Sequence, residues 1–127
     1  MRILVADEQR QVRFALRVLL ERHSGYRVIA EATDAQGLLA QAQVACPDVV
    51  LLSWELPGKD EIDLLSALRQ CCPNLVVIAL SGRLGADQAA LEAGADAFVS
   101  KGKPPEQLMA AISQCCPQLG SPELRGV

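Results

Sequence analysis

The sequence is poor in histidine, in excess basic charge and in long apolar runs. Its single histidine, His23, belongs to no cluster of metal-ligand residues, so a zinc-type site is not indicated. The net charge of −3 gives no electrostatic basis for binding nucleic acid or an anionic membrane surface. No apolar run exceeds about eight residues, which is too short to span a bilayer, and the N-terminus lacks a signal-peptide pattern. We therefore expect a cytoplasmic protein that contacts neither nucleic acid nor membrane directly.

The five cysteines form no CxxC motif, and their number is odd. Two adjacent pairs, Cys71-Cys72 and Cys115-Cys116, stand near the ends of predicted helices, and Cys46 precedes a proline. Such thiols are most often small buried or half-buried side chains. The two pairs should lie on helices that pack on opposite faces of a sheet, beyond the Cα separation of about 7 Å that a disulfide allows. We therefore expect all five thiols to be reduced.

Short apolar runs alternate with helix-period segments along the chain, whose 127 residues suit one domain. The apolar runs are continuous, which is typical of parallel strands buried on both faces. The predicted strands are residues 2–6, 27–31, 49–53, 75–80 and 97–99. The predicted helices are residues 8–22, 35–45, 61–71, 86–93 and 105–115. Asp34 is suited to cap the second helix, and Gly94 to end the fourth.

Polar residues follow four of the predicted strands. Asp7 and Ser53 lie at or just past the ends of the first and third strands, and Ser81 and Lys101 follow the fourth and fifth. Five strands alternating with five helices predict a parallel sheet covered by helices on both faces. In such a sheet, ligands bind at the carboxyl ends of the strands. The four side chains are therefore expected to share one edge and to form one site.

Four stretches, in this order, resemble a known family. They are residues 3–8 (ILVADE), 47–58 (PDVVLLSWELPG), 79–82 (ALSG) and 92–101 (EAGADAFVSK). Together they resemble the receiver domain of two-component response regulators. The resemblance implies a flavodoxin-like, doubly wound α/β fold, with a five-stranded parallel sheet in the order 2-1-3-4-5 and five helices in three α/β/α layers. Residues 1–117 would form this receiver-like domain, and residues 118–127 a short polar C-terminal tail.

The resemblance also implies where a phosphoryl group would arrive. The family has an aspartate at the position of Ser53, and this residue attacks a phosphohistidine or a small phosphodonor. Asp7 and Glu8 match the acidic pair that holds Mg²⁺, and the backbone carbonyl of Glu55 matches a further metal ligand. A serine hydroxyl is a poor nucleophile unless a base activates it, and one carboxylate fewer weakens a Mg²⁺ site. We therefore expect no aspartyl phosphorylation at Ser53 and weak Mg²⁺ binding at most.

Three further residues match the family's response to phosphorylation. Ser81 matches the hydroxyl that bonds the phosphoryl group, Lys101 the lysine that pairs with its oxygens, and Phe98 the aromatic that swings inward in the active state. Taken singly, each has a simpler interpretation: a turn serine, a solvated lysine and a core aromatic. Asp7 could likewise serve only to favour the start of the first helix. It is the joint placement that favours an inherited pocket.

The sequence therefore predicts a stand-alone, degenerate receiver that is not an enzyme and acts through protein–protein contacts in a phosphorelay. Its partners would be signalling proteins, either a histidine kinase or an output protein, and the family also forms homodimers. One alternative is a phosphorylatable receiver in which Ser53 itself or another carboxylate (Glu55, Asp60 or Asp48) is the acceptor. Another is a flavodoxin-like protein that binds a small molecule, but the acidic residues after the first strand would repel a phosphate.

Overall fold

The computed structural model describes residues 1–116, so residue 117 and the predicted tail, 118–127, lie outside the described part. One parallel sheet has the strand order β2-β1-β3-β4-β5. The strands are β1 (Arg2–Ala6), β2 (Arg27–Ala32), β3 (Val49–Ser53), β4 (Val76–Ser81) and β5 (Ala97–Ser100). The helices are α1 (Arg10–Glu21), α2 (Ala35–Ala45), α3 (Glu61–Cys71), α4 (Ala86–Glu92) and α5 (Pro105–Cys115). The predicted fold class and strand order are confirmed.

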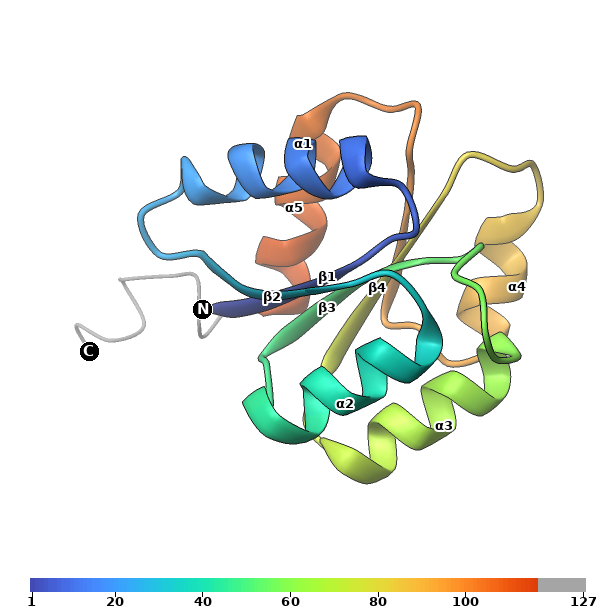
Figure 1. Cartoon of the computed structure of the whole chain (residues 1–127). Coiled ribbons are helices and arrows are strands. Elements are labelled where there is room, and N and C mark those ends of the chain that lie inside the picture. The colour runs from blue at the N-terminus through green and yellow to red at the C-terminus, as the bar shows by residue number, and fades with distance from the viewer. Residues whose placement is uncertain (117–127) are drawn as a thin grey trace.

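The helices cover both faces of the sheet and make three layers (Figure 1). Helices α2, α3 and α4 pack on one face, around a core that includes Leu38 and Leu68. Helices α1 and α5 pack on the other, around a core that includes Leu20 and Ile112. Every residue of the central strand β3 is buried, which explains why this strand reads as a continuous apolar run.

Two predicted caps are present. The Asp34 carboxylate accepts the Gly37 N–H at 2.7 Å at the start of α2. Gly94 follows α4 with φ at 112°, a backbone conformation that glycine adopts without strain. Helix α1 begins two residues later than predicted, because the Asp7 carboxylate accepts the Gln9 N–H at 2.8 Å and forms a turn before the helix.

The chain topology places the ends of β1, β3, β4 and β5 at one edge of the sheet. In-register pairing aligns Ser53 with Leu80, and Ser81 with Ser100. The Trp54 N–H continues this pairing by donating to the Leu80 carbonyl at 2.8 Å. These bonds fix the position of the residue at the end of β3. Within the part of the chain that the structure describes, no helix is both long and apolar enough to cross a membrane.

Candidate functional site

Ser53 lies at the centre of a polar pocket at the carboxyl edge of the sheet. Its side chain is about 1% exposed. The hydroxyl donates to Glu8 Oε1 at 2.9 Å and accepts weak bonds from Lys101 Nζ and the Glu55 N–H, both at 3.4 Å. The four residues come from the ends of three strands, as the sequence predicts. The hydroxyl therefore has both donor and acceptor partners without any ligand.

Lys101 forms its closest contact with Asp7 and not with Ser53. The Lys101 Nζ lies 2.8 Å from Asp7 Oδ2, and the two side chains are 21% and 1% exposed. The Lys101 backbone N–H donates to the Ser81 carbonyl at 3.0 Å, which fixes the base of the lysine beside the pocket. Because the Ser53 hydroxyl carries no charge, the strongest electrostatic partner left for the ammonium group is the Asp7 carboxylate. The ion pair compensates a carboxylate that is almost completely buried.

Glu8 stands at the mouth of the pocket, and its side chain is exposed. Desolvation alone would raise the pKa of Glu8. Hydrogen bonds from its own backbone N–H and from the Ser53 hydroxyl, together with the charge of Lys101, outweigh desolvation and lower the pKa. Glu8 therefore accepts the Ser53 hydrogen bond as a carboxylate. A carboxylate with a lowered pKa is also a weak base.

Ser81 is held by a contact that the sequence did not reveal. Its hydroxyl donates to Glu55 Oε2 at 2.6 Å and accepts the Arg83 N–H at 3.0 Å. The same Glu55 oxygen lies 3.3 Å from Arg83 Nε. The sequence interpretation gave Glu55 a backbone carbonyl ligand and a carboxylate that could replace the acceptor, but no bond to Ser81, and it did not include Arg83. No motif marks these side chains, because they meet only when the β3 and β4 turns are brought together.

The pocket offers Mg²⁺ few free oxygen atoms. Asp7 Oδ2 is paired with Lys101, Glu8 accepts from Ser53, and the Glu55 carboxylate accepts from Ser81. Within residues 1–116, no three His, Cys, Asp or Glu side chains are grouped so that they could hold a metal ion. Mg²⁺ requires several hard oxygen ligands in octahedral geometry. The arrangement thus fits Mg²⁺ poorly, and binding would require Lys101 to leave Asp7.

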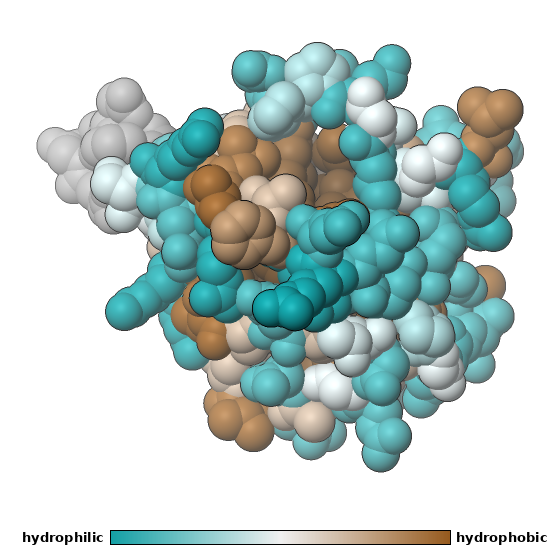
Figure 2. All heavy atoms as spheres, turned by 45° about the horizontal axis from the view of Figure 1, so that its top comes forward, coloured by the Kyte–Doolittle hydropathy of each residue, from teal (hydrophilic) through white to brown (hydrophobic). Residues whose placement is uncertain are grey.

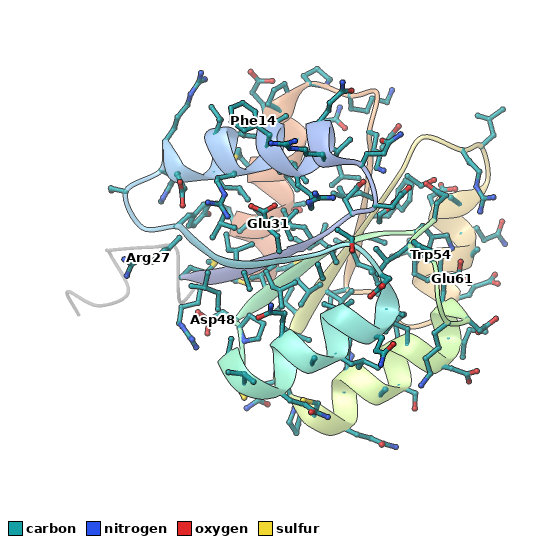
Figure 3. All side chains as sticks on the ribbon, viewed as in Figure 1. Phe14, Arg27, Glu31, Asp48, Trp54 and Glu61 are labelled. Carbon is teal, nitrogen blue, oxygen red and sulfur yellow. The ribbon has the colours of Figure 1, made fainter. Side chains whose placement is uncertain are left out.

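Three other residues singled out in the sequence lie away from the Ser53 hydroxyl. Asp48 precedes β3, and Figure 3 shows it at the opposite end of the sheet from Trp54, where its carboxylate accepts the Arg2 N–H at 2.8 Å. Its choice as a nearby substitute acceptor was wrong, because one strand length separates it from Ser53. Asp60 caps α3 by accepting N–H bonds from its first turn. Phe98 is half-buried on β5 and packs against the core on the α2–α4 face.

Comparisons with known proteins show the family to which the chain belongs. The model of the response regulator receiver domain matches residues 3–113, almost the entire described chain. The chain belongs to the response regulator receiver domain family. It is therefore a receiver domain of two-component signalling, in which Mg²⁺ binding and histidine kinase partners are typical.

Several relatives are about one third identical to this receiver domain over the aligned segments. The transcriptional regulatory protein KdpE of Mycobacterium tuberculosis H37Rv is 39% identical over 100 residues, which are 78% of this chain and 43% of KdpE. The fimbriae Z protein of Salmonella typhimurium is 32% identical over 103 residues, 80% of this chain and 49% of that protein. The chain thus spans less than half the length of either relative. A LuxR-family response regulator from Aurantimonas sp. SI85-9A1 has a TM-score of 0.83 at 32% identity, covering 98% of this chain and 92% of that one.

Proposed function

We propose that this receiver domain is degenerate: it is not phosphorylated on an aspartate, has no catalytic activity and acts by binding other signalling proteins. The observation that carries the proposal is the buried hydroxyl of Ser53 at the end of β3, where the family resemblance places the acceptor aspartate. The Lys101 ammonium, which would otherwise pair with that aspartate, lies against Asp7 at 2.8 Å. The buried Asp7 carboxylate therefore has a charged partner without a phosphoryl group or a metal ion.

Ser53 is also a poor substitute acceptor. Its hydroxyl points at Glu8, whose lowered pKa makes the carboxylate a weak base for removing the serine proton. A phosphoryl group on Ser53 would in addition approach the carboxylates of Glu8 and Asp7. The alternative acceptors fare no better, because Glu55 is occupied by Ser81 and Asp60 caps α3. These contacts favour a module whose output is set by binding.

The α1 and α5 side of the molecule offers a surface for such binding. Phe14 on α1 is 68% exposed and Val18 is 42% exposed. Beside them, a hollow of about 370 Å³ lies between α1 and α5, lined by apolar side chains that include Leu16 and Leu108. Figure 2 turns this side toward the viewer. It shows a hollow lined by apolar side chains and surrounded by hydrophilic ones. We infer that protein partners, a second copy of the chain included, would contact the receiver here.

Incubation with acetyl phosphate and Mg²⁺, followed by intact mass measurement, tests the proposal. The parent protein should gain no phosphoryl group, either acid-stable or acid-labile. A stoichiometric gain would overturn the proposal. Acid stability would then separate a serine ester on Ser53 from an acyl phosphate on a carboxylate.

A Ser53→Asp variant is the matched control for this experiment. The variant returns a carboxylate to the end of β3 beside Lys101, Asp7 and Ser81, so it should gain one acid-labile phosphoryl group. If the variant gains a phosphoryl group and the parent protein gains none, the difference is due to Ser53 alone. Lack of any gain in the variant would show that the pocket differs from active receivers in more than its acceptor.

A further inference from the structure

All five cysteines of the chain line one hollow at the edge of the sheet opposite Ser53. This hollow has a volume of about 440 Å³, and its walls come from the ends of α2, α3 and α5. Figure 3 shows sulfur atoms around this end of the sheet, where Asp48 also lies. The two adjacent pairs stand at the ends of α3 and α5, which pack on opposite faces of the sheet as the sequence predicts. Both helices end at the same edge, however, so their thiols border a common space.

Three of these cysteines lie where α2 and α3 end. Cys46 is the C-cap of α2, and its N–H donates to the Ala42 carbonyl at 2.9 Å. The Cys72 thiol donates to the same Ala42 oxygen at 3.5 Å. The Cys72 sulfur is therefore seated against the last turn of α2, next to Cys46. The Cys71 sulfur lies 3.8 Å from that of Cys72.

We propose that Cys46 and Cys72 form a reversible disulfide that links the end of α2 to the end of α3. Cys46 is exposed and Cys72 is buried, so Cys46 is the thiol that an oxidant reaches first. A bond between Cys71 and Cys72 is disfavoured by geometry. Consecutive Cα atoms lie about 3.8 Å apart across a trans peptide, whereas ordinary disulfides join Cα atoms roughly 4.4–6.8 Å apart.

The reaction needs a two-electron oxidant, and a peroxide supplies it. Hydrogen peroxide oxidises the Cys46 thiol to a sulfenic acid and is reduced to water. The Cys72 sulfur then attacks the Cys46 sulfur, the S–S bond forms, the S–O bond breaks, and the hydroxyl leaves as water with the thiol proton. Burial, followed by contacts with Cys71 and Cys46, raises the pKa of Cys72 to about 12. Cys72 is thus not the thiol that reacts first with peroxide, and its part in the second step follows from its position beside the end of α2.

The second pair of cysteines provides an internal comparison. Burial, and then the nearby Cys115, Asp48 and Asp96, raise the pKa of Cys116 to about 11, and burial and Asp96 raise that of Cys115. A raised pKa keeps these thiols protonated, as it does that of Cys72, so position and not pKa distinguishes the pair. Within residues 1–116, the hydrogen bonds of the Cys72 thiol go to the Ala42 carbonyl and the Cys71 sulfur, and none goes to this pair. We therefore expect these two thiols to stay reduced while Cys46 and Cys72 are oxidised.

Tryptic mapping of the whole protein after peroxide treatment tests the proposal. Free thiols are blocked under denaturing conditions before digestion. Cys46 then lies in the peptide 28–59, Cys71 and Cys72 in 70–83, and the other pair in 102–125. The expected result is a monomer lighter by about 2 Da, in which 28–59 and 70–83 are joined and a thiol reductant separates them.

Four variants identify the two sulfur atoms. Cys46→Ser, at an exposed position, should abolish the joined peptides, and so should Cys72→Ala. Cys71→Ser and Cys115→Ser should keep them. The proposal is overturned if the peptides remain unjoined after Cys46 has been oxidised, if 102–125 takes part, if the link joins two molecules, or if Cys71→Ser removes it. Should Cys72→Ala fail to fold, the results with Cys46→Ser and Cys71→Ser still decide.

Discussion

Replacing Lys101 by methionine should destabilise the protein more than any comparable surface substitution. The Lys101 ammonium lies 2.8 Å from Asp7 Oδ2, and Asp7 is 1% exposed. At an effective dielectric constant of about 20, two unit charges at this separation attract by roughly 6 kcal/mol before desolvation is subtracted. Removing one partner of a buried pair typically costs about 3–5 kcal/mol because a buried charge is left uncompensated. Since Lys101 is 21% exposed, water will partly replace it, and we expect a loss of about 3 kcal/mol in the free energy of unfolding.

Urea unfolding of the parent and of three variants measures this loss. Asp7→Asn should cost only about 1 kcal/mol, because the released lysine can reach water. The double variant Lys101→Met with Asp7→Asn should be more stable than Lys101→Met alone by about 2 kcal/mol, since no buried charge remains. Lys103→Met is the matched control: Lys103 is exposed, and its replacement should change the free energy of unfolding by less than about 0.5 kcal/mol.

Two results would refute this reasoning. If Lys101→Met unfolded at the same urea concentration as the parent, the Asp7 charge would not depend on Lys101 in solution. If Asp7→Asn failed to rescue Lys101→Met, the loss would come from the lysine stem and its packing and not from the ion pair.

Three further predictions concern the same pocket. Mg²⁺ titrated calorimetrically should bind the parent more weakly than a Ser53→Asp variant, because the added carboxylate draws Lys101 from Asp7; equal affinities would contradict this. Oligomeric state, measured by ultracentrifugation, should not respond to beryllofluoride and Mg²⁺, and a shift in mass or shape would show that the pocket still senses a phosphoryl analogue. The lowered pKa of Glu8 stabilises the fold above its ordinary value of 4.5, and this contribution is lost as pH falls through the folded pKa. Glu8→Gln should therefore flatten the acid side of a plot of stability against pH; an unchanged slope there would count against the Glu8 contacts.

Much of the fold could be predicted because its signals are local. The continuous apolar runs of β1 and β3 gave the observed bounds, as did the helical patterns of α2, α3 and α5. The errors are of one or two residues at the ends of the other elements. Helix α1 starts late because the Asp7 carboxylate binds the Gln9 N–H, and periodicity does not report such a bond.

The sequence could predict which residues gather at the site, but not which side chains contact each other there. Asp7, Ser53 and Lys101 share an edge because parallel strands in this order end together, and the order of motifs in the sequence implies that. Which groups pair is a different question. Ser81 bonds to the Glu55 carboxylate because two turns approach each other, and no sequence motif predicts that bond. Asp48 was misplaced because proximity in sequence to Ser53 hides the length of a strand between them.

The sequence by itself determined the layered α/β fold, the edge at which polar residues gather, and the absence of an aspartate at Ser53. Periodicity and strand-end position carry that information, and both are properties of short segments. Only the tertiary structure decided that Lys101 pairs with Asp7 and that the Cys72 thiol lies against the last turn of α2, which Cys46 ends. Such contacts join side chains far apart along the chain, and their choice depends on distances and burial that exist only after the sheet has brought them together.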